Sequence, residues 1–340
     1  MLPSGQIRRP GGGRKDIVKT QQTVEEIFLE VIEGHVAGDP MNKDIRWLKL
    51  TRAEISEKMR AYRVEISRNI VRKLMKKHKF VKRKLQRKRS TGTSIFREQQ
   101  FKNILSVKEA FMKSANPIIS VDTKKKEPIG GNLHRNGSVY CTQAVEVSDH
   151  DYEHLSECKI APHGIYDVKQ NKAHITIGTS AETAEFICDS LEKWWLTRGK
   201  KSYPKAKEIL MFCDAGGANC YRHHIFKAEV QLLVNKIKIP LKIMHYPPYA
   251  SKWNPIEHRV FPHVTRALEG TPLNTVKEAK NRIICAKTKT GLKVTASIIQ
   301  KRYETGKIVA KNFMENMKIT FGESVPLLNY TISPMRNCKM

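Results

Sequence analysis

From about residue 116 onward, apolar stretches that fit buried β-strands alternate with helices in a fixed order. We expect strands over 117–122, 138–147 and 173–178, a helix over 180–198, a strand over 208–213, a helix over 218–236, a strand over 241–246 and a last helix opening at Asn254-Pro255. In that last helix, Asn254 is the predicted N-cap and Pro255 holds the first position that proline favours. Such an order predicts an α/β domain with helices on the faces of a mixed sheet.

Three acidic residues stand where these elements end or begin. Asp122 ends IISVD, Asp214 ends ILMFCD, and Glu257 lies in the first turn of the last helix. Each alone could be an ordinary turn or helix-cap residue. Together they suit a two-metal site, in which carboxylates from separate elements hold two Mg²⁺ or Mn²⁺ ions roughly 3.5–4 Å apart.

The order of elements is that of an RNase H-like domain, and we expect Asp122, Asp214 and Glu257 to be its catalytic and metal-binding residues. Gly216-Gly217 would let the chain turn tightly after Asp214. Lys252 and Arg259 could meet the phosphates of a substrate. Asp167 is the reserve candidate for a metal ligand.

The chain is strongly basic, with a formal net charge of +29 over 340 residues. Charge of this size favours a polyanionic partner, because phosphate contacts release counterions. The first 100 residues hold 25 Lys and Arg against 11 Asp and Glu, and residues 71–89 hold 11 basic residues and no acid. No apolar run reaches the length of a membrane span, so we expect nucleic acid and not a membrane as the partner.

The basic N-terminal part has helical periodicity. Apolar positions over 24–36 fit one helix, and Thr51 with Glu54 forms a capping-box pattern that opens a second. A third helix begins at Ser67, with Ile70, Val71, Leu74 and Met75 on one side and basic residues mostly on the other. Helix, turn and basic helix predict a helix-turn-helix that places the last helix in the DNA major groove, although a helical hairpin with a solvated face has the same pattern. The expected DNA contacts there are Arg68, Arg72, Lys73, Lys76, Lys77, Lys82, Arg83 and Lys84.

Other features exclude some classes of protein. The N-terminus lacks the apolar core of a signal peptide, and seven scattered cysteines argue against a disulfide framework, so we expect a reducing compartment. His154, Cys158 and His163 lie close in sequence, but a fourth ligand at zinc spacing is missing. A structural zinc site is therefore not expected.

Several motifs together resemble DDE transposases of the bacterial insertion-sequence group ISAzo, from about residue 8 to 330. These motifs are ISVDTKKKE, YDVKQN, the Trp194-Trp195 pair, CDAGGAN, SKWNPIEHR and NYTISP. The segment PPYASKWNPIE is also similar to that of mariner-related transposases. The resemblance implies an RNase H-like catalytic domain that cuts and joins transposon ends, with Asp122, Asp214 and Glu257 as its metal-binding triad.

Three departures from that family are visible. Its members usually carry a further helical DNA-binding region before RRPGGGRK, and they usually read GTSKWNKIEH where this chain reads YASKWNPIEH. Pro262 interrupts the Glu257 helix, so this helix should kink or end near Phe261. None of these departures removes a predicted metal ligand.

The expected organisation is a basic Gly-rich arm (1–20), a small all-α helix-turn-helix domain with a basic tail (21–90), a linker helix (91–115) and the catalytic domain (116–335). The leading hypothesis is a DNA transposase that acts on double-stranded terminal repeats and target DNA, as a homo-oligomer on paired ends. Its compartment would be the cytoplasm and nucleoid, or the nucleus in a eukaryotic host. Two alternatives stay open: a catalytically silent, transposase-derived DNA-binding protein, and an RNase H-type nuclease without strand transfer.

Overall fold

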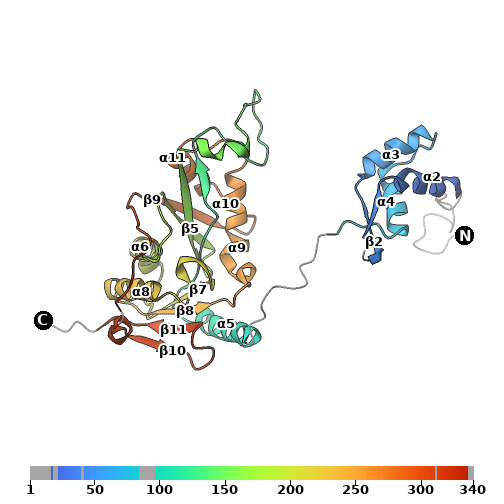
Figure 1. The fold of residues 1–340 in the computed structure, drawn as a ribbon. Coiled ribbons are helices and arrows are strands. Elements are labelled where there is room, and N and C mark those ends of the chain that lie inside the picture. Colours follow the sequence, from blue (N-terminus) through green and yellow to red (C-terminus); the bar gives the residue numbers. More distant parts are fainter. Residues whose placement is uncertain (1–16, 18–21, 40–41, 84–95, 311, 336–340) are drawn as a thin grey trace, which may run out of the picture. The chain divides into compact units, whose positions relative to one another are not determined.

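The computed structural model describes residues 17, 22–39, 42–83, 96–310 and 312–335. Two compact units, 1–88 and 89–340, make up the chain (Figure 1). Apart from residue 17, the predicted arm 1–20 lies outside the described residues, and so does Lys84. No helix among the described residues is long and apolar enough to cross a membrane.

The described part of the smaller unit contains helices and a β-hairpin. Its elements are α2 (Gln22–Glu33), β1 (Val36–Asp39), β2 (Asn42–Leu48), α3 (Arg52–Ala61) and α4 (Arg68–Lys77). Thr51 and Glu54 form the predicted capping box at the start of α3. On α4, Val71 and Leu74 are buried, whereas the basic residues predicted on that helix are all exposed.

The prediction of an all-α domain was wrong in one respect. The helix expected to run to Val36 ends at Glu33, because Gly34 and His35 form a turn that leads into the antiparallel pair β1–β2. A glycine is among the poorest helix residues, since it loses the most backbone freedom on folding.

A single mixed sheet is the centre of the larger unit. Its strands are β3 (Ile118–Thr123), β4 (Glu127–Ile129), β5 (Cys158–Asp167), β6 (Lys172–Gly178), β7 (Ile209–Cys213), β8 (Leu241–His245), β9 (Lys293–Ile299), β10 (Ile319–Phe321) and β11 (Asn329–Ile332). Their order is β10-β11-β8-β7-β3-β5-β6-β9, and β4 pairs with β5. The five central strands lie in the order β6-β5-β3-β7-β8. β5 is antiparallel to both β6 and β3, whereas β7 is parallel to both β3 and β8. This arrangement confirms the RNase H-like fold.

Helices cover both faces of this sheet. The helices of the larger unit are α5 (Arg97–Met112), α6 (Ala184–Trp194), α7 (Lys200–Ser202), α8 (His224–Ile237), α9 (Pro255–Arg259), α10 (Phe261–Ala267) and α11 (Val276–Ile284), with short helical turns over His150–Leu155, Trp195–Gly199, Gly217–Asn219, Ser251–Trp253 and Phe313–Asn316. One face packs on α6 and α8, and the other packs on α5 and on α9, α10 and α11.

Helix α5 lies in the segment expected to be a linker helix, and it packs against the sheet. Its Gln100 is fully buried and donates hydrogen bonds to the His245 carbonyl and to Asn329 Oδ1, both at 2.8 Å. Ile104 and Phe111 of the same helix join a core cluster with β7 and β8. Within 91–115, the part that the structure describes therefore belongs to the larger unit.

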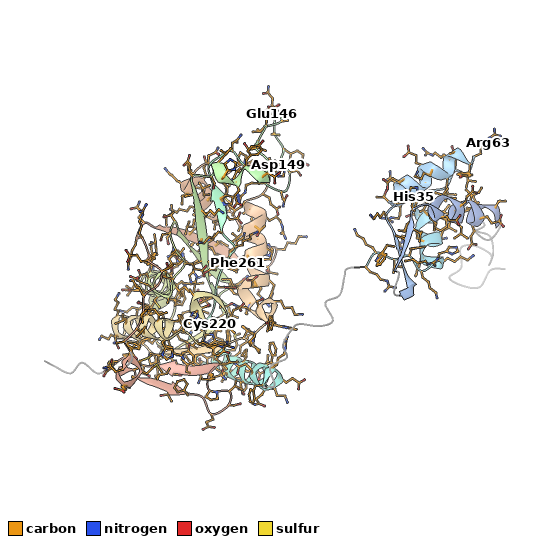
Figure 2. All side chains as sticks on the ribbon, viewed as in Figure 1. His35, Arg63, Glu146, Asp149, Cys220 and Phe261 are labelled. Carbon is orange, nitrogen blue, oxygen red and sulfur yellow. The ribbon has the colours of Figure 1, made fainter. Side chains whose placement is uncertain are left out.

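One predicted strand was wrong. Residues 138–147 form no strand, and Val139, Tyr140 and Val145 are exposed. Figure 2 labels Glu146 in this segment and Asp149 just after it, where the chain projects from the rest of the larger unit. β5, and not 138–147, is the strand that pairs with β3 and β6. β5, β9, β10 and β11 had no counterpart in the sequence-based prediction.

Candidate active site

Asp122 and Asp214 lie at the same edge of the sheet. Asp122 is near the end of β3, and Asp214 directly follows β7. These two strands are parallel neighbours, with Ser120 opposite Phe212, so both chains leave the sheet in the same direction. Gly217 takes a positive φ of 74° just beyond Asp214 and turns the chain there, as predicted.

Helix α9 brings Glu257 to the two aspartates. It packs across β3 and β5, and this is possible because Gly164 of β5 has no side chain. A Cβ atom at Gly164 would lie 2.5 Å from Ile256 Cδ1 and 2.9 Å from Phe261 Cε1. The helix ends at Arg259 and α10 begins at Phe261, so the predicted break before Pro262 is confirmed.

A buried Ser120–Asn254 pair joins α9 to the strands. Asn254 is the N-cap residue by position, but its side chain makes no capping bond. Instead, the hydroxyl of Ser120 accepts from the Ile256 N–H at 2.9 Å and donates to Asn254 Oδ1. Asn254 Nδ2 donates to the Val121 carbonyl at 3.2 Å and to Asp214 Oδ1 at 3.1 Å. One amide thus fixes β3, α9 and the Asp214 carboxylate together.

A second buried group, His245, holds the backbone of Asp214. Burial lowers the pKa of His245 to about 4, so the ring is neutral near pH 7. Its Nδ1 lies 3.0 Å from the Asp214 carbonyl oxygen and donates to it. In this tautomer Nε2 accepts from the Tyr330 hydroxyl at 2.9 Å. Tyr330 belongs to β11, the neighbour of β8, so a strand beyond the central five helps to position Asp214.

The three carboxyl groups interact strongly. Burial, a hydrogen bond to Glu257 and the charge of Asp214 together raise the pKa of Asp122 to about 9. Burial and the charge of Glu257 raise the pKa of Asp214 to about 6, against the lowering effect of the Asn254 amide. Carboxyl groups with such pKa values in one place are typical of functional sites.

Divalent cations suit this set of ligands. Lys252 and Arg259, predicted beside the site, are exposed and form no ion pair with a described carboxylate. Within the described residues, the three partly buried carboxyl groups form no ion pair, and hard cations such as Mg²⁺ prefer oxygen ligands. Among the residues described, no group of three or more Asp, Glu, His or Cys side chains is arranged as a preformed metal site.

Asp167, the reserve candidate, has a different role. Its carboxylate accepts hydrogen bonds from the Tyr203 hydroxyl and from the backbone N–H groups of Lys169 and Gln170. These bonds close the turn between β5 and β6. Asp167 lies opposite Ile119, at the start of β3, whereas Asp122 lies near its end. The structure therefore does not bring Asp167 into the candidate site.

The smaller unit presents a separate basic surface. Arg68, Arg72, Lys76, Lys82 and Arg83 are exposed, as are Lys73 and Lys77. Lys77 forms an ion pair with Glu25 at 2.5 Å, and His78 lies 2.8 Å from the same carboxylate. These contacts fix the end of α4 to α2 and leave most of the basic face of α4 to solvent.

The family of the chain follows from a family model that matches residues 28–334. Its description is "Rhodopirellula transposase DDE domain". The chain belongs to this family of DDE transposases. In this transposase the matched region includes β3, β7 and α9, the elements at which the three acids of the candidate site stand.

Similar solved structures include three complexes of Mos1 transposase. The paired-end complex with the left transposon end is 13% identical, and 81% of this chain and 72% of that chain are covered, with a TM-score of 0.40. The strand transfer complex is 12% identical with coverages of 81% and 71%, and the paired-end complex with Mn is 12% identical with coverages of 81% and 72%. Both have TM-scores of 0.40. No curated protein matches the transposase.

Sequence reasoning missed the residues that position the acids. Ser120, Asn254, His245 and Tyr330 form the hydrogen bonds around Asp214 and α9. Asn254 lies in SKWNPIEHR and Tyr330 in NYTISP, two of the motifs that resemble the transposase family, and His245 lies just before PPYASKWNPIE. The hydrogen-bond partners of these residues are far away in the sequence, so they follow only from which strands are neighbours in the sheet.

Asn254→Ala should slow DNA cleavage by the transposase by about 10²-fold, because a displacement of about 1 Å in a catalytic group can have that effect. Removing the amide also leaves buried partners without a hydrogen bond, which costs about 1–3 kcal/mol of stability. Asn254→Asp provides the comparison, since it keeps the shape but adds a negative charge beside Asp214. Cleavage by Asn254→Ala at the wild-type rate would show that this amide does not position the site.

Proposed function

We propose that this transposase hydrolyses a phosphodiester at the ends of its element and then joins the freed 3′-hydroxyl to target DNA. Asp122, Asp214 and Glu257 would hold two Mg²⁺ or Mn²⁺ ions. The observation that carries the proposal is the gathering of three carboxyl groups, two with raised pKa values, at one edge of the sheet, with no basic partner among the described residues. Bound divalent ions supply Lewis acidity at the phosphate and lower the pKa of water.

The protein's own groups would provide the geometry of this reaction. Asn254 holds the Asp214 carboxylate and His245 holds its carbonyl, so Asp214 is fixed from two sides. Ser120 ties the first turn of α9 to β3 and so fixes Glu257 relative to Asp122. A rigid arrangement of ligands reduces the reorganisation needed at the moment of reaction.

Double-stranded DNA is the proposed partner of both units. The exposed basic residues of α4 and Lys82-Arg83 would bind the terminal repeats as a helix-turn-helix, and Lys252 and Arg259 would contact phosphates near the cut. Work on two paired ends would require a homo-oligomer. We place this activity in the nucleoid, or in the nucleus of a eukaryotic host.

Asp214→Asn tests the proposal directly. The substrate is a plasmid that carries the element's own ends, and nicking and joining are measured with Mg²⁺ and with Mn²⁺. We expect a loss of about 10³-fold or more, since a ligand to a catalytic ion contributes several kcal/mol to the transition state. Glu323→Gln, an exposed carboxylate of the same unit, is the matched control and should keep wild-type rates.

The same assay separates this proposal from related activities. Nicking without joined product, even with a pre-cut 3′-hydroxyl end, would indicate a nuclease. Salt-sensitive DNA binding with no cleavage by the wild type would indicate a silent DNA-binding protein. Equal activity of Asp214→Asn and wild type would remove Asp214 from the site.

A further inference from the structure

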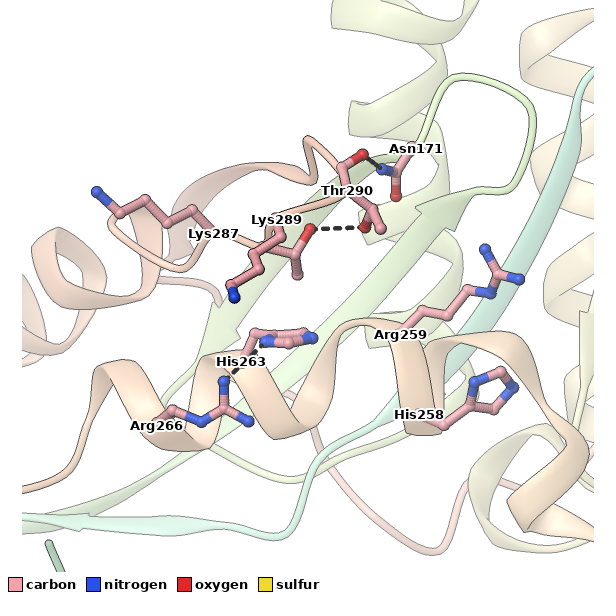
Figure 3. Close-up of a pocket in the computed structure, with 9 residues that line it drawn as sticks. Asn171, His258, Arg259, His263, Arg266, Lys287, Lys289 and Thr290 are labelled. Carbon is pink, nitrogen blue, oxygen red and sulfur yellow. Dashed lines mark hydrogen bonds between the residues drawn. The ribbon is translucent and has the colours of Figure 1, made fainter. Parts of the chain in front are cut away.

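A groove of about 790 Å³ lies beside α9 and α10, on the larger unit. One wall consists of side chains from α9 and α10, including Arg259, His263 and Arg266. The other wall is the loop 287–290 between α11 and β9, with Lys287 and Lys289. Figure 3 shows the two walls facing each other across the opening. We call this the basic groove.

Among the described residues, the lining of the basic groove carries positive charge and no carboxylate. Its four cationic side chains, Arg259, Arg266, Lys287 and Lys289, are all exposed. Within the described part of the chain, none of them forms an ion pair. By contrast, Lys301 and Lys307 elsewhere on the unit are paired with Glu185. Cations left without a partner on two facing walls fit an anion that bridges them.

Polar groups of the groove add hydrogen-bond donors. Arg266 Nη1 lies 3.3 Å from His263 Nδ1. A guanidinium can only donate, so Nδ1 accepts and the Nε2–H of a neutral His263 remains a donor. Arginine forks and imidazole N–H groups suit phosphate oxygens.

The loop that carries Lys287 and Lys289 is held by its own hydrogen bonds. Asn171 Nδ2 donates to the Thr290 carbonyl at 2.9 Å, and the Lys293 N–H donates to the Asn171 carbonyl at 3.2 Å. The Leu292 N–H donates to Thr288 Oγ1 at 3.1 Å. The basic side of the loop is thus ordered before any ligand arrives, which lowers the entropic cost of binding.

One residue of the basic groove stands in the same helix as a carboxylate of the candidate site. Arg259, in its lining, is two residues beyond Glu257 and lies in the last turn of the same short helix. Residues two apart do not share a helix face, so the groove lies on a different side of α9 from Glu257 and suits a DNA strand other than the one at the carboxylates.

We propose that the basic groove binds the sugar-phosphate backbone of a DNA strand next to the strand that is cut. This inference rests on the proposed function for the substrate, but its test does not require catalysis. The ligand chemistry is a chain of phosphodiesters, supplied either by a paired duplex or by an unpaired strand.

The test compares the full-length variant K287A/K289A with wild type. DNA affinity is measured by fluorescence anisotropy with a 30-mer duplex and with a 30-mer single strand, over a series of salt concentrations. For duplex DNA, the slope of log K against log salt should fall by about 0.9 for each phosphate that the variant no longer neutralises. The charge-matched control K201A/K205A removes two exposed lysines elsewhere on the unit and should keep the wild-type slope. K287R/K289R, which keeps the charge, should also keep it.

Each outcome decides the proposal. A reduced slope with both probes supports it, and a reduced slope with the duplex alone supports it and identifies a paired flank as the ligand. Unchanged affinity and slope with both probes would overturn it. Failure of the wild type to cleave DNA would count against the proposed function, while the salt slopes would still test the groove.

Discussion

Asp122→Asn is expected to stabilise the metal-free protein and at the same time to abolish DNA cleavage. In the folded protein, burial and the neighbouring acids raise the pKa of Asp122 to about 9, from an ordinary value of 3.8. Between these pH values the folded protein retains a proton that the unfolded chain releases. The contribution of Asp122 to stability is therefore full below about pH 4 and is lost as the pH rises toward 9.

Asparagine removes this loss, because it has no charge to bury. The free energy of unfolding of Asp122→Asn should exceed that of wild type by about 1–3 kcal/mol at pH 8, with a much smaller difference at pH 5. Urea unfolding at the two pH values, with a chelator present, measures the difference. Asp167→Ala is the control, since it leaves the turn N–H groups and Tyr203 without their acceptor and should destabilise the protein. A stability of Asp122→Asn below that of wild type at pH 8 would contradict the interpretation.

Gly164→Ala should destabilise the larger unit and displace the helix that carries Glu257. The added Cβ would lie 2.5 Å from Ile256 Cδ1, and Ile256 is fully buried beside Glu257. Overpacking of this kind costs about 1–3 kcal/mol. Movement of α9 should also reduce the rate of DNA cleavage by at least about tenfold, since catalytic geometry tolerates little displacement. Thermal unfolding and the nicking assay measure the two effects.

Two further variants test the cause of that effect. At Gly216 a Cβ would meet nothing within 4 Å, so Gly216→Ala should change stability by less than about 0.5 kcal/mol. Ile256→Val removes the atom that clashes, so the pair Gly164→Ala/Ile256→Val should be more stable than the sum of the single changes implies. Strict additivity of the two changes would show that the contact does not limit the position of α9.

The sequence was sufficient to predict the elements that carry the acids. β3, β7 and β8 are short apolar runs with both faces covered, and Asp122 and Asp214 stand at the ends of the first two. The break at Pro262 follows from the lack of a backbone N–H and the shape of the proline ring. These features are local, so they could be read without the fold.

Features that depend on distant partners could not be predicted. β5 contains Pro162, His163 and Gly164, which are poor strand signals, yet it pairs with β3, β4 and β6. Residues 138–147 alternate like a strand but have no neighbour that would bury them. A pattern that fits a strand becomes one only where a partner strand supplies hydrogen bonds and cover.

The same limit applies to the candidate site. Three acids at element ends predicted its place, but the hydrogen bonds from Ser120, Asn254 and His245 depend on residues 31 to 136 positions apart in the chain. Gly164 gave no signal as a site residue. Its role appears only when α9 is seen against β5.

The most direct test of the metal triad is a calorimetric titration of Mn²⁺ into wild type, Asp122→Asn and Glu323→Gln. If Asp122, Asp214 and Glu257 hold the ions, wild type and Glu323→Gln should bind two Mn²⁺, and Asp122→Asn should lose at least one of them with a fall of about tenfold or more in affinity for the other, because each ion shares its carboxylates. Binding of Mn²⁺ by Asp122→Asn with the wild-type number of ions and the wild-type affinity would contradict the metal triad.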